Sequence, residues 1–208
     1  MFDPRSEVGS GLVESTPQHF SLPSIGSPSG RSCAPEHQPN AGGCAPPYDL
    51  GMPPITPCFW FDGNADAAVD HYVSIFPNSK RLVGSEYGPD TPGEEGSTLA
   101  VSFELDGKPF MALNGGPAFH FTPAISFVVN CETQGEVDHY WDRLVDGGEP
   151  SRCGWLTDRF GVSWQVVPSR LGELMSDPDS GRANRVMQAM LKMIKLDIAQ
   201  LEAAAAGD

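Results

Sequence analysis

The stretch ITPCFWFDGNADAAVDHYVSIF, residues 55–76, decides the fold. It opens with a short apolar and aromatic run, which predicts a buried strand over residues 55–61. The turn Asp62-Gly63-Asn64 then supplies a helix N-cap. Apolar residues recur at helical spacing up to Phe76, and Pro77 ends the helix. A strand that leads directly into an amphipathic helix is therefore expected.

Further strands are predicted after this helix. They cover residues 81–87, 98–105 and 109–113. The dipeptide Asp106-Gly107 between the last two is a strong hairpin signal. Together with the first strand and its helix, these segments make one β-α-β-β-β unit.

The same pattern starts again at Thr122-Pro123, which echoes Thr56-Pro57. A strand over 125–129 precedes a helix over 134–145, and strands are predicted near 151–156 and 162–167.

The two predicted helices share a tetrapeptide, Val-Asp-His-Tyr, at residues 69–72 and again at 137–140. Its matching place in both units indicates an internal duplication. Coincidence within an ordinary α+β domain is the alternative.

Different segments flank the repeated body. Residues 1–52 are rich in Pro, Ser and Gly and have no apolar periodicity, which predicts disorder. This head is either a regulatory tail or the product of an early start codon. After Pro168 a short helix is expected over 171–175, followed by one long helix to about Ala206. An apolar stripe on the long helix indicates core packing or a dimer seam; its members are Val186, Met190, Met193, Ile194, Ile198 and Leu201.

The predicted fold class is therefore α+β, with paired β-α-β-β-β modules. Residues 53–170 would form these modules, 53–117 and 118–170, and residues 171–208 a C-terminal helical extension.

Composition indicates which classes of binding partner and which cellular compartment to expect. The formal net charge of −14 argues against nucleic acid and against anionic membranes. No apolar run approaches the roughly 18 residues of a membrane span, and the N-terminus lacks the pattern of a signal peptide. The five cysteines are odd in number and lack CxxC spacing, which favours free thiols in a reducing compartment. The sequence predicts a cytoplasmic protein.

Several motifs resemble the PhnB-like family of the vicinal oxygen chelate (glyoxalase/bleomycin resistance) superfamily, often labelled 3-demethylubiquinone-9 3-methyltransferase. The segments that carry the resemblance are ITPCFWFDGNA (55–65), FELDG (103–107), MALNGGP (111–117), CGWL (153–156), DRFGVSWQVVP (158–168) and RVMQAML (185–191). The resemblance covers about residues 53–203. It implies paired modules whose strands curl into a cup for a small molecule, commonly in a homodimer.

The methyltransferase label has little support from the residues. Enzymes of the usual doubly wound type bind S-adenosylmethionine at a glycine-rich turn between a strand and a helix. Here Gly115-Gly116-Pro117 follows a predicted hairpin strand and leads into no predicted helix.

The resemblance also shows which positions of this chain correspond to metal ligands in other members of the superfamily. Metal-dependent members of the superfamily carry His or Glu on the first and last strands of each module. The matching positions of this chain hold Pro57, Asn114, Ala124 and Gln165. Two amides without imidazole or carboxylate give a divalent cation little charge compensation. We therefore expect no metal and no cofactor.

The sequence suggests ligand-binding residues but no catalytic ones. The candidates, chosen for an aromatic ring or a polar group near the cup, are Trp60, Asn114, His120, Trp155 and Gln165. The strand cysteines Cys58 and Cys153 fit buried, inert thiols. The leading hypothesis is a protein that binds a small molecule in a metal-free cup and forms homodimers. The alternatives are a metal-dependent lyase, isomerase or dioxygenase, and a partner-binding dimer whose pocket is vestigial.

Overall fold

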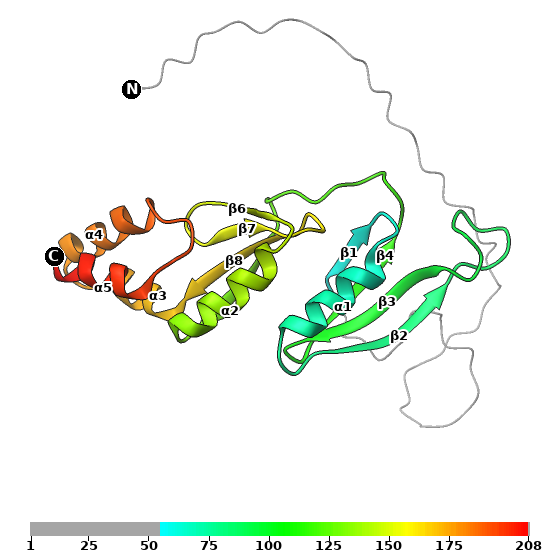
Figure 1. The fold of residues 1–208 in the computed structure, drawn as a ribbon, viewed down its shortest axis with the longest axis horizontal. Helices are drawn as coiled ribbons and strands as arrows, with labels where there is room; N and C mark the ends of the chain where they lie inside the picture. Colours follow the sequence, from blue (N-terminus) through cyan, green and yellow to red (C-terminus); the bar gives the residue numbers. More distant parts are fainter. Residues whose placement is uncertain (1–54, 208) are drawn as a thin grey trace, which may run out of the picture. The chain divides into compact units, whose positions relative to one another are not determined.

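The computed structural model describes residues 55–207, which form two four-stranded sheets with a helix on one face of each (Figure 1). The first sheet has the order β1–β4–β3–β2, with bounds β1 (Cys58–Phe61), β2 (Lys80–Glu86), β3 (Thr98–Leu105) and β4 (Lys108–Asn114). The second has the order β5–β8–β7–β6, with bounds β5 (Phe127–Cys131), β6 (Glu149–Pro150), β7 (Trp155–Thr157) and β8 (Ser163–Pro168). The predicted disordered head, residues 1–52, lies outside the described residues.

The two sheets repeat one topology. In each, the first strand pairs in parallel with the last, β1 with β4 and β5 with β8, while the other pairs are antiparallel. A parallel pair needs a crossover, and helices α1 (Ala65–Ile75) and α2 (Gln134–Val145) follow the first strands. The predicted α+β fold of paired β-α-β-β-β modules is confirmed. Among the described helices, none is long and apolar enough to cross a membrane.

The hairpin signal in the first module is also confirmed. Leu105 pairs with Lys108, which leaves Asp106 and Gly107 as the two-residue turn between β3 and β4. Both have positive φ, 48° and 70°, as a type I′ turn requires.

The predicted strand over 151–156 is wrong for residues 151–154, which form a turn, and right for residues 155–156. β6 ends at Pro150 and β7 begins at Trp155. Between them Cys153 and Gly154 have φ of 59° and 80°, and this left-handed backbone cannot continue a strand. A Cβ on Gly154 would also lie 2.6 Å from the carbonyl oxygen of Val166.

The long C-terminal helix predicted from the sequence is two helices. After α3 (Ser169–Met175), the chain forms α4 (Ser180–Met190), breaks, and resumes as α5 (Ile198–Ala206). In the break, the carbonyls of Met193 and Ile194 accept hydrogen bonds from the backbone N–H groups of Cys153 (2.9 Å) and Gly154 (2.8 Å). These carbonyls, which follow the end of α4 at Met190, thus bond to the turn between β6 and β7 and not to a further helical turn.

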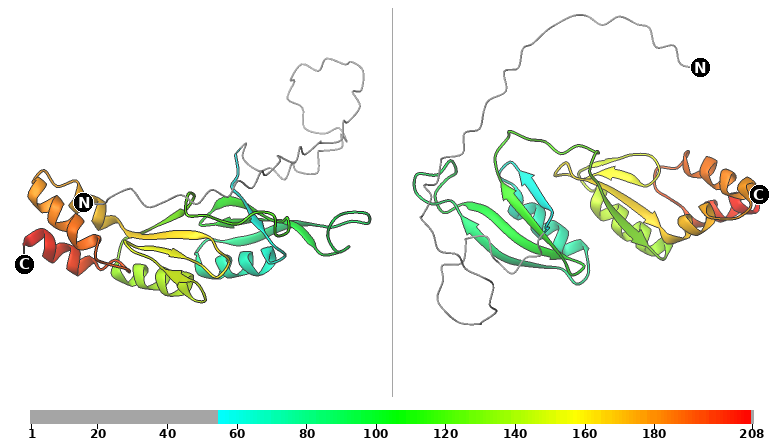
Figure 2. Two further views of the ribbon diagram at one scale, coloured as in Figure 1. Left: turned by 90° about the horizontal axis from the view of Figure 1, so that it is seen from above. Right: turned by 180° about the vertical axis from the view of Figure 1, so that it is seen from behind.

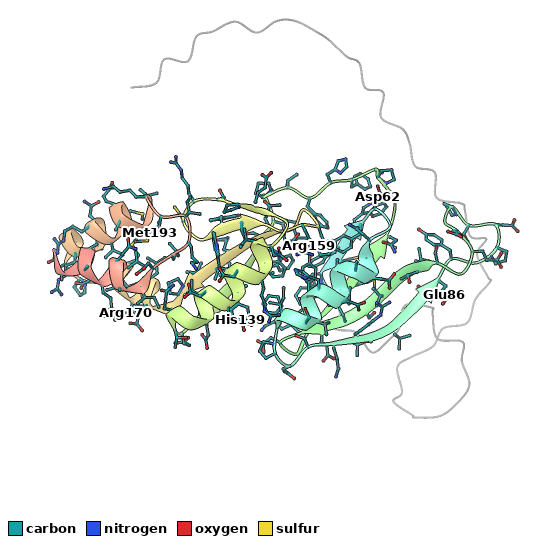
Figure 3. The ribbon with its side chains drawn as sticks, viewed as in Figure 1. Asp62, Glu86, His139, Arg159, Arg170 and Met193 are labelled. Carbon is teal, nitrogen blue, oxygen red and sulfur yellow. The ribbon has the colours of Figure 1, made fainter. Side chains whose placement is uncertain are left out.

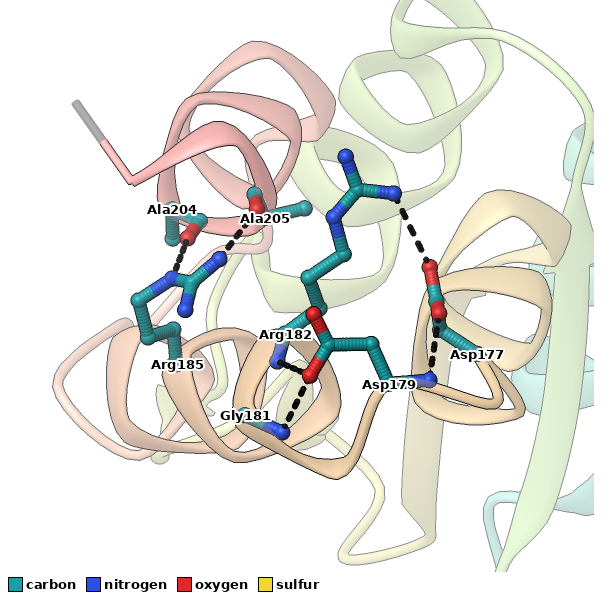
Figure 4. Close-up of polar contacts among 7 residues, drawn as sticks. All are labelled: Asp177, Asp179, Gly181, Arg182, Arg185, Ala204 and Ala205. Atoms are coloured by element: carbon teal, nitrogen blue, oxygen red, sulfur yellow. Dashed lines mark hydrogen bonds and ion pairs between the residues drawn. The ribbon is translucent and has the colours of Figure 1, made fainter.

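Capping groups fix the new helix ends. The side chain of Asp197 accepts from Gln200 N at 2.9 Å, and Gln134 on α2 accepts from Ile198 N at 2.9 Å. Figure 4 shows Arg185 donating to the carbonyls of Ala204 and Ala205 at the end of α5. It also shows Asp179 capping the start of α4.

The apolar stripe of this region packs mainly inward. Leu196 and Leu201 are fully buried, in a small core with Val186 and Met193. Ile194 is the exception, with 52% of its surface exposed. The stripe thus joins the C-terminal helices to one another, and a dimer seam along it stays a prediction.

The two modules share one hydrophobic core along a junction that we call the seam. Across it, Phe59 of β1 meets Phe127 of β5 at a ring distance of 5.0 Å. Phe76 stacks on Tyr140 of α2 at 5.3 Å and on Trp164 of β8 at 5.5 Å. The modules therefore pack as one body through aromatic side chains.

A buried carboxylate also links the two modules by a hydrogen bond across the seam. Asp158, which is 3% exposed, accepts hydrogen bonds from the hydroxyl of Tyr72 (2.7 Å) and the indole of Trp164 (2.8 Å). Its other oxygen accepts from the backbone N–H groups of Phe160 (2.8 Å) and Val162 (3.0 Å). Burial raises the pKa of Tyr72 well above its ordinary value, and the Asp158 charge raises it further, so the hydroxyl stays a donor. We call this set the Asp158 network.

The surroundings of His71, beside Tyr72 on α1, indicate that the fold loses stability in acid. Its Nε2 atom is buried without a hydrogen-bond partner among the described residues, and its ring lies 5.6 Å from that of Phe160. Burial first, and then the charge of Arg159, lowers the pKa of His71. Figure 3 labels Arg159 near this junction.

We expect the free energy of unfolding to fall as the pH drops below the ordinary histidine pKa of about 6.5, because the unfolded chain then binds a proton that the folded chain resists. Urea unfolding at about pH 7.5 and about pH 5.5 measures the loss, which His71→Phe should reduce because Phe does not titrate. Equal losses in both proteins would contradict this role.

Candidate functional site

Each sheet has one face that the module helices do not cover. α1 packs on β3 and β4, and α2 on β5, β7 and β8. In the left view of Figure 2, both helices lie on the same side of the sheets. We call the other side of the described sheets the open face.

Strand registers place matching rows of side chains on the open face. In the first sheet Trp60, Leu113 and Ala100 are neighbours across three strands, all partly exposed. In the second sheet the corresponding row is Trp155, Gln165 and Val128. The alternation of strand side chains therefore puts three of the five predicted ligand-binding residues on this face.

A cavity of about 360 Å³ lies where the two modules meet. We call it the Trp60 cavity. Most of its lining is apolar or aromatic, and the remainder is polar without Asp, Glu, Lys or Arg. The lining residues are Pro57, Cys58, Phe59, Trp60, His120, Phe121, Thr122, Ile125, Phe127, Val162 and Ser163.

Trp60 is held rigidly in this lining. Its indole N–H donates to the carbonyl of Gly116 at 2.8 Å, and its ring meets Phe119 edge to face at 5.0 Å. Gly115 permits this position, because a Cβ there would lie 2.2 Å from the indole ring. The GGP motif thus lets the chain pass close beside Trp60, in a segment that follows β4 and contains no helix.

His120 reaches the same cavity from the segment between the modules, so the structure brings together Trp60 and His120. The side chains of His120, Thr122 and Ser163 have no hydrogen-bond partner among the described residues. Ser163 is only 3% exposed as a residue and borders the cavity, whereas His120 and Thr122 are exposed. Such groups are available to a ligand.

Trp155 and Gln165 form a second group on the open face. Gln165 donates from its amide to the hydroxyl of Ser126 at 2.9 Å, which fixes the orientation of its side chain. Neither residue lines the Trp60 cavity. The structure therefore divides these predicted residues between the cavity and the sheet of the second module.

Asn114 lies on the helix side of its sheet. Its amide oxygen accepts from Ala65 N at 2.9 Å, at the start of α1, and its amide nitrogen donates to the carbonyl of Thr98 at 2.9 Å. Both polar ends of the Asn114 side chain thus stabilise the fold. The amide oxygen accepts from a backbone N–H at the start of α1, where the side chain of Asn64 makes no capping hydrogen bond. A ligand-binding role for Asn114 stays a prediction.

The donor groups of the site do not suit a metal. Within residues 55–207, no three His, Cys, Asp or Glu side chains come together in a way that could hold an ion. The cavity offers one imidazole, His120, and one thiol, Cys58. Cys58 is exposed rather than buried as the sequence suggested, but partial desolvation still raises the pKa of its thiol, which makes it a poorer metal ligand.

A different cavity of about 340 Å³ also borders the seam, lined in part by Phe76, Tyr140 and Trp164. Its rim carries Lys108 and Asp106, whose side chains pair at 3.0 Å. None of the predicted ligand-binding residues lines it. The Trp60 cavity is therefore the stronger candidate site.

Sequence reasoning did not single out Thr122, Ile125 or Ser163, which complete the Trp60 cavity. One signal was present for Ser163, a polar residue two positions before Gln165 and therefore on the same side of β8. Thr122 lies outside the strands, and Ile125, which the sequence placed at the start of a strand over 125–129, precedes β5, so strand periodicity does not mark the direction of either side chain.

Comparison with known proteins agrees with the motifs and the fold. A family model described as 3-demethylubiquinone-9 3-methyltransferase matches residues 53–167. Among solved structures, the PhnB protein from Bacillus cereus is 34% identical with a TM-score of 0.53, and the match covers 56% of this chain and 100% of that one. Protein PA1353 from Pseudomonas aeruginosa is 22% identical with a TM-score of 0.46, covering 55% of this chain and 96% of the other.

The fosfomycin resistance protein FosX from Listeria monocytogenes is 14% identical with a TM-score of 0.39, covering 57% of this chain and 94% of the other. No curated protein matches the chain. The resemblance predicted from the sequence motifs is confirmed by the family match and by the Bacillus cereus structure. The chain belongs to the 3-demethylubiquinone-9 3-methyltransferase family, the PhnB-like branch of the vicinal oxygen chelate superfamily.

Proposed function

We propose that this protein binds a small organic molecule in the Trp60 cavity without a metal ion. The observation that carries the proposal is the meeting of Trp60 and His120, from separate segments, in one cavity of about 360 Å³ with aromatic walls and free hydrogen-bonding groups. Ligand sites in proteins combine an apolar lining with a few polar groups in this way.

Native mass spectrometry of freshly purified, untagged protein tests this proposal, because it reports bound organic molecules and metals together. We expect an organic ligand on the wild type and its loss from Trp60→Ala. Leu191→Ala, an exposed residue outside the cavity, is the matched control and should keep the ligand. Retention of the ligand by Trp60→Ala would place binding elsewhere.

The family label favours a methyl transfer, but the geometry gives it less support. Gly115-Gly116-Pro117 follows β4 and leads into a loop, and the described sheets are mixed rather than doubly wound. A helix N-terminus at a glycine-rich turn, which binds the cofactor in the usual methyltransferases, is not formed by these residues.

A metal-dependent lyase, isomerase or dioxygenase is the second candidate, because the wider superfamily contains such enzymes. The positions that would ligate the metal hold Pro57, Asn114, Ala124 and Gln165. Asn114 and Gln165 already hydrogen-bond within the protein. This donor set lacks the charge that stabilises a bound dication.

We accordingly expect Zn²⁺, Mn²⁺ and Ni²⁺ to leave the melting temperature unchanged, since a ligand raises it only by binding the folded state. Differential scanning fluorimetry with each ion, and with EDTA as the control, measures this. A rise with one ion that EDTA reverses, together with one metal per chain by mass spectrometry, would favour the enzyme.

We also propose a homodimer in the cytoplasm. The open face carries the partly exposed Trp60, Leu113 and Trp155, and Val128 is 52% exposed. β1 and β5 are edge strands of their sheets, with unpaired backbone groups. A second copy would cover these surfaces, and the reduced state of Cys58, Cys131 and Cys153 fits a reducing compartment.

Light scattering should therefore give twice the chain mass of 22.3 kDa at micromolar concentration. Val128→Glu should shift the protein toward the monomer, because it places a charge on the apolar open face. A wild-type mass of one chain would contradict the dimer.

A further inference from the structure

We infer that the ligand of the Trp60 cavity is uncharged and planar, with one or two rings and a hydrogen-bonding group. This inference rests on the proposed function and adds the chemical class of the molecule. It follows from three properties of the lining: its charge, its rings and its unpartnered polar groups.

None of the described residues that border the cavity is Asp, Glu, Lys or Arg. An anion would find no cation to replace its lost hydration, and the chain's net charge of −14 would repel it. A cation would find no carboxylate, and a cation–π contact alone does not replace the hydration it loses. A neutral molecule avoids both costs.

Aromatic side chains from both modules form the walls. Phe59 meets Phe127 at 5.0 Å and Phe121 at 6.2 Å, in both cases edge to face. Trp60 adds the largest ring and is fixed by its bond to Gly116. Rings held at such angles favour a flat ring that can stack or meet them edge on. A volume of about 360 Å³ suits a molecule of one or two rings.

The polar groups of the lining include one imidazole and two hydroxyls. His120, Thr122 and Ser163 border the cavity and make no side-chain hydrogen bond to a described residue. Hydroxyls can donate and accept, so they suit a phenol, a carbonyl or an amide rather than an ion. Ser163 is the least exposed of the three residues, at 3%, and gives the strongest of these indications.

A matched series of two-ring probes tests the inference. The probes are 2-naphthol, 2-naphthoate and 2-naphthylmethylammonium, which share a shape and differ in charge at neutral pH. We expect isothermal titration of the full chain to give the tightest binding for 2-naphthol. Each ion should bind at least about tenfold more weakly, because its charge would be buried without a partner. Tighter binding of either ion than of 2-naphthol would overturn the inference and leave the proposed function intact.

Charge variants at the cavity rim sharpen the test. Ile125 borders the cavity but is 75% exposed, so Ile125→Lys and Ile125→Asp should fold normally. The lysine variant should gain affinity for 2-naphthoate and the aspartate variant for the ammonium probe. Val83→Lys, at a position 61% exposed on β2, is the control and should match the wild type. If no probe binds the wild type or either Ile125 variant, the proposed function fails and this inference falls with it.

Discussion

Replacing Asp158 by asparagine is expected to lower the free energy of unfolding by about 3 kcal/mol, since the change leaves buried donors without acceptors. One carboxylate oxygen accepts from Tyr72 and Trp164, and the other from two backbone N–H groups. An amide replaces one acceptor with a donor, which would face the N–H or O–H groups that the carboxylate now satisfies. The melting temperature should fall by roughly 6–12 °C for a domain of this size.

Two comparisons make this measurement specific. Asp146→Asn changes an exposed carboxylate that pairs with Arg159 and should cost less than about 1 kcal/mol. Tyr72→Phe removes one hydrogen bond of the Asp158 network and should cost an intermediate amount. Urea unfolding gives all three values. An Asp158→Asn loss no larger than that of Asp146→Asn would show that the network does not stabilise the seam.

The second large effect is expected at Leu196, in the break between α4 and α5. Its side chain is fully buried and belongs to the C-terminal core. Leu196→Ala should therefore cost about 3 kcal/mol, because it removes buried methyl groups and leaves a cavity. The same truncation at Leu191, which is 46% exposed, is the matched control and should cost less than about 0.5 kcal/mol.

The Leu196→Ala substitution should also destabilise residues outside the C-terminal helices. Gln134 of α2 donates to the carbonyl of Leu196 at 3.2 Å, and Gly154 lies next to its side chain. Hydrogen exchange at the amides of Cys153 and Gly154, which bond to the break, should speed up in Leu196→Ala. Unchanged exchange there would mean that the C-terminal helices do not support the β6–β7 turn.

Periodicity in the sequence predicted the sheets and most side-chain directions. Trp60, Trp155 and Gln165 lie on strands whose alternate residues are buried apolar groups, so their direction follows from the period of two. Asn114 was harder because it is the last residue of β4. The alternation that buries Phe110 and Ala112 also turns Asn114 toward α1, away from the open face.

The features that the sequence did not predict depend on contacts between residues far apart in the chain. No Pro or Gly occurs in residues 191–197, so the N-cap residue Asp197 is the one local signal of the helix break, and the hydrogen bonds to the β6–β7 turn leave no mark in the sequence. Asp158 reads from the sequence as a turn residue only, because its partner Tyr72 is 86 residues away. His120 was chosen for its chemistry, and only packing between the modules sets it beside Trp60.

The repeated tetrapeptide has a consequence for recombination between relatives. Tyr72 ends the first copy and bonds to Asp158 of the second module, whereas Tyr140 ends the second copy and stacks on Phe76 of the first. The same tetrapeptide therefore makes a different contact with the opposite module in each copy, a hydrogen bond from Tyr72 and ring stacking by Tyr140. A chimera that imported one module from another family member would lose these contacts unless it also brought compatible partners, so we expect such exchanges to destabilise the fold.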